Sequence, residues 1–166
     1  IALAVLVLDP TLLAHGRLAH SDAGATALGT TALFVVWRWS RRSSWTRALV
    51  AGLLLALTLL AKVSGVLWLA AAGLIVLAAL WQRRRDGHLA TQAGHAVAML
   101  AVAGLAWWAV YGFAWGRSAA FPLAVPAPSY WDALQYLRDY TTDLFALGTR
   151  QAGHRGWWWY FPLAFL

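Results

Sequence analysis

The residues best suited to chemistry lie in one polar strip between two apolar runs. The strip reads Asp9-Pro-Thr-Leu-Leu-Ala-His15-Gly-Arg17-Leu-Ala-His20-Ser-Asp22 and holds two carboxylates, two imidazoles and a guanidinium. Ionisable groups beside a membrane core are energetically expensive, so a dense set of them indicates function. These side-chain types predict acid–base chemistry or the binding of an anionic group.

The two carboxylates of the strip differ in the roles that their sequence positions indicate. Asp9 precedes Pro10, and Asp-Pro-Thr is a favourable helix start, so we interpret Asp9 as a helix cap. Asp22 follows Ser21 at the start of the next apolar run. It fits equally well a cap at the positive end of a helix dipole and a catalytic carboxylate.

The basic side chains indicate anion binding more than metal binding. His15 and His20 are five residues apart, which is not the spacing of a helical zinc pair, and the chain contains no Glu. A divalent metal ion is therefore a possible cofactor but the less favoured interpretation. Arg17 and Lys62, the only lysine, fit either phosphate binding or anchoring at the lipid headgroups.

The composition identifies an integral membrane protein. Hydrophobic residues make up 61% of the 166 and charged residues only 11%, which leaves too little polar surface for a soluble fold. The net charge of +7 comes from clusters between apolar runs, a pattern that sets membrane topology. We therefore expect membrane lipids, and no nucleic acid, as partners. The absence of Cys excludes disulfides and thiolate metal sites within this sequence.

The elements that must position these residues are membrane-spanning helices. About 20 apolar residues cross a hydrocarbon core of roughly 30 Å. By this measure we predict an all-α, polytopic transmembrane helix bundle in a single partial domain, with spans at 1–8, 23–37, 48–61, 65–81, 92–115 and 157–166.

The apolar run 48–81 is interrupted near Lys62, and we interpret it as a hairpin of two spans. Arg-rich clusters lie at both ends of this run, at 38–47 and 83–88. Two crossings place both clusters in the cytoplasm, as the positive-inside rule favours, whereas one long crossing does not. The strip 9–22 and the Lys62 turn then lie on the outer face.

An outer loop is predicted at 116–156 on the same face. It contains a short amphipathic stretch, 129–147, which we expect to form a helix on the membrane surface. The spans themselves are almost free of polar groups, which favours chemistry at one interface over transport across the bilayer. A transporter and a non-catalytic membrane scaffold remain the alternatives.

The loop is followed by an aromatic block, Gly156-Trp-Trp-Trp-Tyr-Phe-Pro162. Such a block is typical of the membrane interface. Because aromatic faces also stack on sugars, Trp157, Trp158 and Tyr160 are possible sugar or interface contacts.

The order of these motifs resembles a known family. PTLLAHGRLAHSD, LLALTLLAKVSG and GTRQAGHRGWWWYFPLAFL, separated by basic loops, are similar to the bacterial phospholipid-carrier-dependent glycosyltransferases. These belong to the GT-C superfamily of protein O-mannosyltransferases and lipid A aminoarabinose transferases. A third Trp stands where the family more usually has Tyr, at Trp159.

The resemblance implies a multi-spanning GT-C fold in the bacterial cytoplasmic membrane. It implies transfer of a sugar from a polyprenyl-phosphate carrier to a protein, lipid or glycan acceptor on the extracytoplasmic face. By the same resemblance Asp22 matches an active-site Asp, and we expect Arg17, His20 and Lys62 to face the carrier phosphate. The other acidic motif of the family would lie before residue 1, so we expect an internal fragment that is inactive alone.

Overall fold

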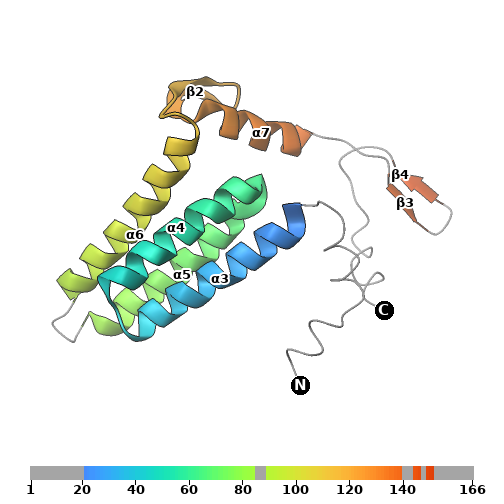
Figure 1. The fold of residues 1–166 in the computed structure, drawn as a ribbon. Helices are drawn as coiled ribbons and strands as arrows, with labels where there is room; N and C mark the ends of the chain where they lie inside the picture. Colours follow the sequence, from blue (N-terminus) through green and yellow to red (C-terminus); the bar gives the residue numbers. More distant parts are fainter. Residues whose placement is uncertain (1–20, 85–88, 140–143, 147–148, 152–166) are drawn as a thin grey trace. The chain divides into compact units, whose positions relative to one another are not determined.

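The computed structural model describes residues 21–84, 89–139, 144–146 and 149–151. The chain divides into two compact units, Ile1–Ala114 and Trp115–Leu166. In the first unit, the structure is helical, as predicted. Its described elements are α3 (Ser21–Arg41), α4 (Trp45–Ala61), the short 3₁₀ helix η1 (Val63–Gly65), α5 (Val66–Arg83) and α6 (Leu89–Val110) (Figure 1).

Small side chains dominate the core of the first unit. Helix α4 packs against both α3 and α6, and α3 also packs against α5. A Cβ atom added at Gly52 of α4 would lie 2.4 Å from the Met99 carbonyl oxygen of α6, so only glycine permits this approach. Such close packing through small residues is typical of membrane helices. Seven alanines belong to this core: Ala32, Ala48, Ala51, Ala72, Ala79, Ala96 and Ala103.

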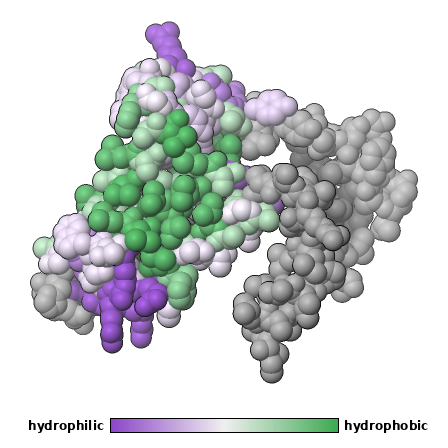
Figure 2. Space-filling model, viewed as in Figure 1, coloured by the Kyte–Doolittle hydropathy of each residue, from purple (hydrophilic) through white to green (hydrophobic). Residues whose placement is uncertain are grey.

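The outer surface of the same helices is strongly apolar. Figure 2 shows a hydrophobic band across the helices, with hydrophilic side chains at the end where α3 meets α4. Two helical segments, Val63–Arg83 and Leu89–Val110, are long and apolar enough to cross a membrane, and α4 is apolar but shorter. Large aliphatic side chains are more than half exposed at Leu67, Leu74, Leu77, Val97, Leu100 and Leu105. Lipid is the environment that suits such a surface.

The predicted break at Lys62 is confirmed. Helix α4 ends at Ala61, and Lys62 has extended backbone angles (φ −156°, ψ 139°) before η1 begins. The Gly65 amide donates to the Lys62 carbonyl at 2.8 Å, and a Cβ at Gly65 would lie 2.5 Å from the Thr58 carbonyl oxygen. The turn is therefore folded tightly onto the last turn of α4.

Helix α6 ends at Val110, earlier than the predicted limit of 115, because a Schellman motif closes it. The Phe113 amide donates to the Trp108 carbonyl (3.1 Å) and the Gly112 amide to the Ala109 carbonyl (2.9 Å), while Gly112 has φ +63°. This pattern satisfies the last carbonyls of a helix. The rings of Trp108 and Phe113 make the accompanying edge contact, with centroids 5.2 Å apart.

The second unit contains one helix and two short hairpins among its described residues. The helix expected within 129–147 is α7 (Pro128–Asp139), which ends earlier than predicted. The hairpins were not predicted. Strand β1 (Trp115–Ser118) pairs antiparallel with β2 (Phe121–Pro126), with an irregularity at Arg117/Ser118, and β3 (Leu144–Ala146) pairs with β4 (Thr149–Gln151). A two-stranded ribbon has only edge strands, so β2 tolerates its two prolines.

Side chains of α7 fasten the first hairpin. Asp132 accepts hydrogen bonds from the Ser118 hydroxyl (2.8 Å) and the Ala119 amide (2.7 Å). The Trp131 indole donates to the Pro126 carbonyl at 2.9 Å, and its ring meets Phe121 edge-on. The hairpin is thus held by local polar contacts rather than by a large core.

Candidate functional site

Two of the candidate residues form an ion pair. The Lys62 ammonium donates to a carboxylate oxygen of Asp22, although the residues are 40 positions apart in the sequence. The Lys62 side chain is 39% exposed and that of Asp22 is 56% exposed. Both charged groups are therefore accessible to a ligand while they remain in contact.

Helix packing brings the two groups together. Asp22 lies in the first turn of α3, and Lys62 follows the last residue of α4. The two helices pack side by side and run in opposite directions. The start of α3 therefore lies next to the end of α4 (Figure 1). A carboxylate at a helix N-terminus and a cation at a helix C-terminus each complement the helix dipole.

The other candidates fall outside the described residues. These are Arg17 and His20 of the strip, together with Asp9 and His15, and Trp157, Trp158 and Tyr160 of the aromatic block. Their roles stay predictions. Within the part of the chain that the structure describes, no group of three His or Asp side chains is placed to hold a metal ion.

The ion pair offers two complementary chemical capacities. An ionised carboxylate accepts a proton from a hydroxyl group, which is the task of a general base. An ammonium group offsets negative charge that develops on a departing phosphate. A phosphate that reaches Lys62 would compete with the Asp22 carboxylate for the ammonium.

The opposite end of the helices carries arginines with structural roles that the sequence did not indicate. The Arg83 Nη2 atom of α5 donates to the carbonyls of Ser40 (3.3 Å) and Arg41 (2.9 Å) at the end of α3. With the Gln92 amide oriented so that its oxygen faces Arg83, that oxygen accepts from Nη1 (3.1 Å) and Nε (3.2 Å). Arg83 thereby links α3, α5 and α6, and it satisfies carbonyls that a helix end leaves open.

A buried histidine lies near this end. His95 of α6 is 4% exposed, and neither ring nitrogen has a hydrogen-bond partner among the described residues. Its ring meets Trp45 of α4 edge-on, with centroids 4.5 Å apart. Packing, rather than hydrogen bonding, therefore holds this imidazole.

Comparison with known proteins gives one family match. A family model described as dolichyl-phosphate-mannose-protein mannosyltransferase matches residues 1–120. No match was found among curated proteins or among solved structures. The matched segment includes the polar strip, helices α3 to α6 and the ion pair, and the aromatic block lies beyond it.

Proposed function

Because the chain belongs to the dolichyl-phosphate-mannose-protein mannosyltransferase family, and so to the membrane glycosyltransferases of GT-C type, we propose that Asp22 and Lys62 form part of its transfer site. The donor in this proposal is a sugar linked to a polyprenyl phosphate, and the acceptor is a hydroxyl group of a protein, lipid or glycan. The observation that carries the proposal is the accessible ion pair within the matched segment.

The transfer step follows from the chemistry of the two groups. The acceptor hydroxyl oxygen attacks the anomeric carbon, and the bond from that carbon to the carrier phosphate oxygen breaks, leaving its electron pair on the phosphate. The hydroxyl proton passes to the Asp22 carboxylate. The Lys62 ammonium offsets the charge on the released polyprenyl phosphate. Arg17 and His20 of the adjoining strip are proposed to contact the same phosphate.

The charge distribution supports an extracytoplasmic position for this site. Asp22 and Arg38 are 16 residues apart on α3, or about 24 Å at the rise of an α-helix. That distance approaches the thickness of a hydrocarbon core. Since arginine clusters favour the cytoplasmic side, the ion pair at the other end of α3 is proposed to face outwards.

The first test replaces the proposed base. We expect Asp22→Asn in the full-length protein to lower the rate of sugar transfer from a polyprenyl-phosphate donor by about 10²–10⁴-fold, the usual contribution of a general base. The protein level in the membrane should stay normal, because an exposed ion pair contributes only about 0.2–1 kcal/mol to stability. Transfer at the wild-type rate would contradict the proposal.

A charge swap separates catalysis from structure. The double variant Asp22→Lys/Lys62→Asp keeps an ion pair between the same positions but moves the carboxylate. If the pair only fastens α3 to α4, the swap restores whatever the single variants lose. We expect instead that the swap restores the part of the thermal stability in detergent that comes from the ion pair, less the unfavourable interaction of the exchanged charges with the two helix dipoles, while transfer stays as low as in Asp22→Asn.

A further inference from the structure

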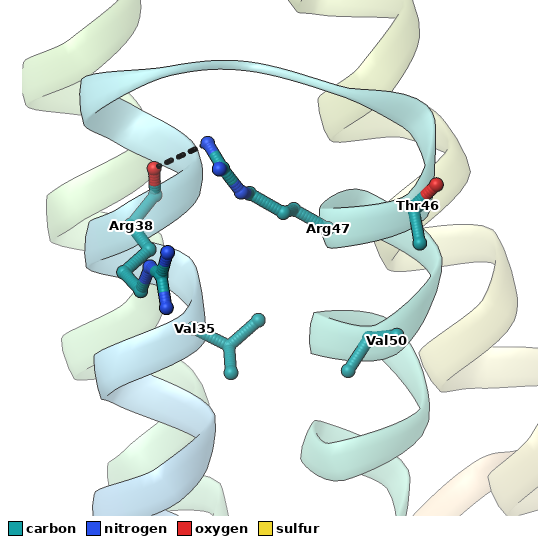
Figure 3. A pocket seen from close by; sticks show the side chains of 5 residues that line it. All are labelled: Val35, Arg38, Thr46, Arg47 and Val50. Atoms are coloured by element: carbon teal, nitrogen blue, oxygen red, sulfur yellow. Dashed lines mark hydrogen bonds between the residues drawn. The ribbon is translucent and has the colours of Figure 1, made fainter.

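A cavity of about 240 Å³ lies between the end of α3 and the start of α4. It is lined by Val35 and Arg38 of α3 and by Thr46, Arg47 and Val50 of α4. In Figure 3, Val35 and Val50 face each other across the space between the helices, Arg47 extends toward the end of α3, and the Arg38 side chain extends away from the connecting loop. The cavity is therefore lined by both guanidinium groups and apolar side chains.

Internal hydrogen bonds hold one of these arginines in place. The Arg47 Nη1 atom donates to the carbonyls of Arg38 (3.4 Å) and Arg42 (2.5 Å). The Arg38 carbonyl, in the last turn of α3, also accepts from the Arg42 amide at 3.1 Å, whereas Arg42 follows the last residue of α3, where a helix end leaves carbonyls open. Among the described residues, neither Nε nor Nη2 of Arg47 makes a hydrogen bond, so these donors remain for a ligand.

The second arginine is also without a carboxylate partner in the described part of the chain. The Arg38 guanidinium lies over the Phe34 ring, 5.9 Å from its centroid. Two guanidinium groups with no anion between them favour a phosphate, whose geometry matches their planar forks. The cavity supplies that charge at a membrane helix end, where lipid headgroups lie.

The apolar side chains that line and adjoin the cavity favour a lipid over a free phosphate. Val50 is 44% exposed, and Leu49 and Leu53 on the same helix are 45% and 50% exposed. Phe34 on α3 is 52% exposed. An acyl chain leaving the cavity therefore continues along apolar side chains, whereas a small soluble phosphate makes no contact with them.

We propose that this cavity, defined by Val35, Arg38, Thr46, Arg47 and Val50, binds one anionic phospholipid. The lipid phosphodiester contacts the two arginines, and the first carbons of its acyl chains pack on the two valines. The site lies at the opposite end of α3 from Asp22, so it is separate from the proposed transfer site and does not depend on it.

The test measures lipid binding to the purified full-length protein in a neutral detergent by native mass spectrometry. Phosphatidylglycerol is the probe, phosphatidylcholine the zwitterionic control and glycerol phosphate the soluble control. We expect Arg38→Gln to weaken phosphatidylglycerol binding about tenfold, the equivalent of one charge-assisted contact. Arg41→Gln is the matched control, since Arg41 is an exposed arginine of the same helix end that does not line the cavity; it should change binding less than twofold.

Three outcomes would overturn the site. Equal losses in Arg38→Gln and Arg41→Gln would show a general surface charge effect. Equal binding of phosphatidylcholine would remove the role of charge, and equal binding of glycerol phosphate would remove the role of the valines. The rate of sugar transfer by Arg38→Gln in neutral detergent should match that of the wild type. Lipid binding and sugar transfer therefore test the lipid site and the transfer site separately.

Discussion

At the scale of single residues, the exposure of the ion pair between Asp22 and Lys62 limits what the pair contributes to stability. Both side chains are more than a third exposed, and water screens such a pair. Burying the pair would hold the fold more firmly but would prevent substrate access. The exposure therefore fits a pair whose contact gives way when a phosphate approaches Lys62.

His95 illustrates the opposite case, a polar side chain buried for its shape. Both ring nitrogens lack partners among the described residues, and a buried polar group without a hydrogen bond destabilises a protein by about 1–3 kcal/mol. We expect His95→Phe to keep the ring contact with Trp45 and to raise the melting temperature in detergent. His95→Ala, which loses that contact, should lower it. A lower melting temperature for His95→Phe would show that the imidazole has a polar partner.

Residue types and charge patterns were enough to select Asp22 and Lys62 as candidates. They did not predict that the two side chains are in direct contact. The arginine clusters predicted that Asp22 and Lys62 lie on the same side of the membrane, because the positive-inside rule depends only on local composition. Their direct contact depends on how α3 packs against α4. The spans are apolar all round, so hydrophobic periodicity gives no packing face, and only the small residues distinguish one side from another.

At the scale of elements, the approach of α4 to α6 depends on one glycine. A Cβ atom at Gly52 would lie 2.4 Å from the Met99 carbonyl oxygen and 3.0 Å from the Val102 side chain, whereas one at Gly104 of α6 would meet nothing within 4 Å. We expect Gly52→Ala to destabilise the protein by about 1–3 kcal/mol through overpacking. Gly104→Ala should stabilise it by about 0.5–1 kcal/mol through helix propensity.

Reversible unfolding in mixed micelles measures the free energy of unfolding of both variants. The two variants add the same methyl group to a glycine inside a helix, so their difference isolates the space available. Equal effects would mean that α4 and α6 do not approach each other at Gly52.

Elements were predicted best where composition alone decides them. The break at Lys62 and the helical spans follow from hydropathy and charge, and the structure confirms the break. The helix end at Val110 and the β1–β2 hairpin were missed. The first depends on the left-handed backbone at Gly112, and the second places Pro122 and Pro126 in a strand, which composition alone disfavours.

At the scale of the whole molecule, the absence of cysteine permits a clean test of topology. We expect a Ser64→Cys variant, beside Lys62, to react with a membrane-impermeant maleimide in intact cells. Ser43→Cys, in the loop between α3 and α4, should react only after the cells are permeabilised, because the positive-inside rule favours a cytoplasmic position for the arginine-rich end. Labelling of both positions from the same side would overturn the two-crossing hairpin and the outward position of the transfer site.

The closed end of α6 has a consequence for where the chain accepts an engineered insertion. Residues 108–114 complete the hydrogen bonds of the helix end among themselves, including the Trp108 indole, which donates to the Ala114 carbonyl at 2.8 Å. These bonds close the helix end within a short stretch of consecutive residues. An insertion made after residue 114 therefore leaves these hydrogen bonds in place, which marks this position as a suitable point for fusing a reporter domain to the chain.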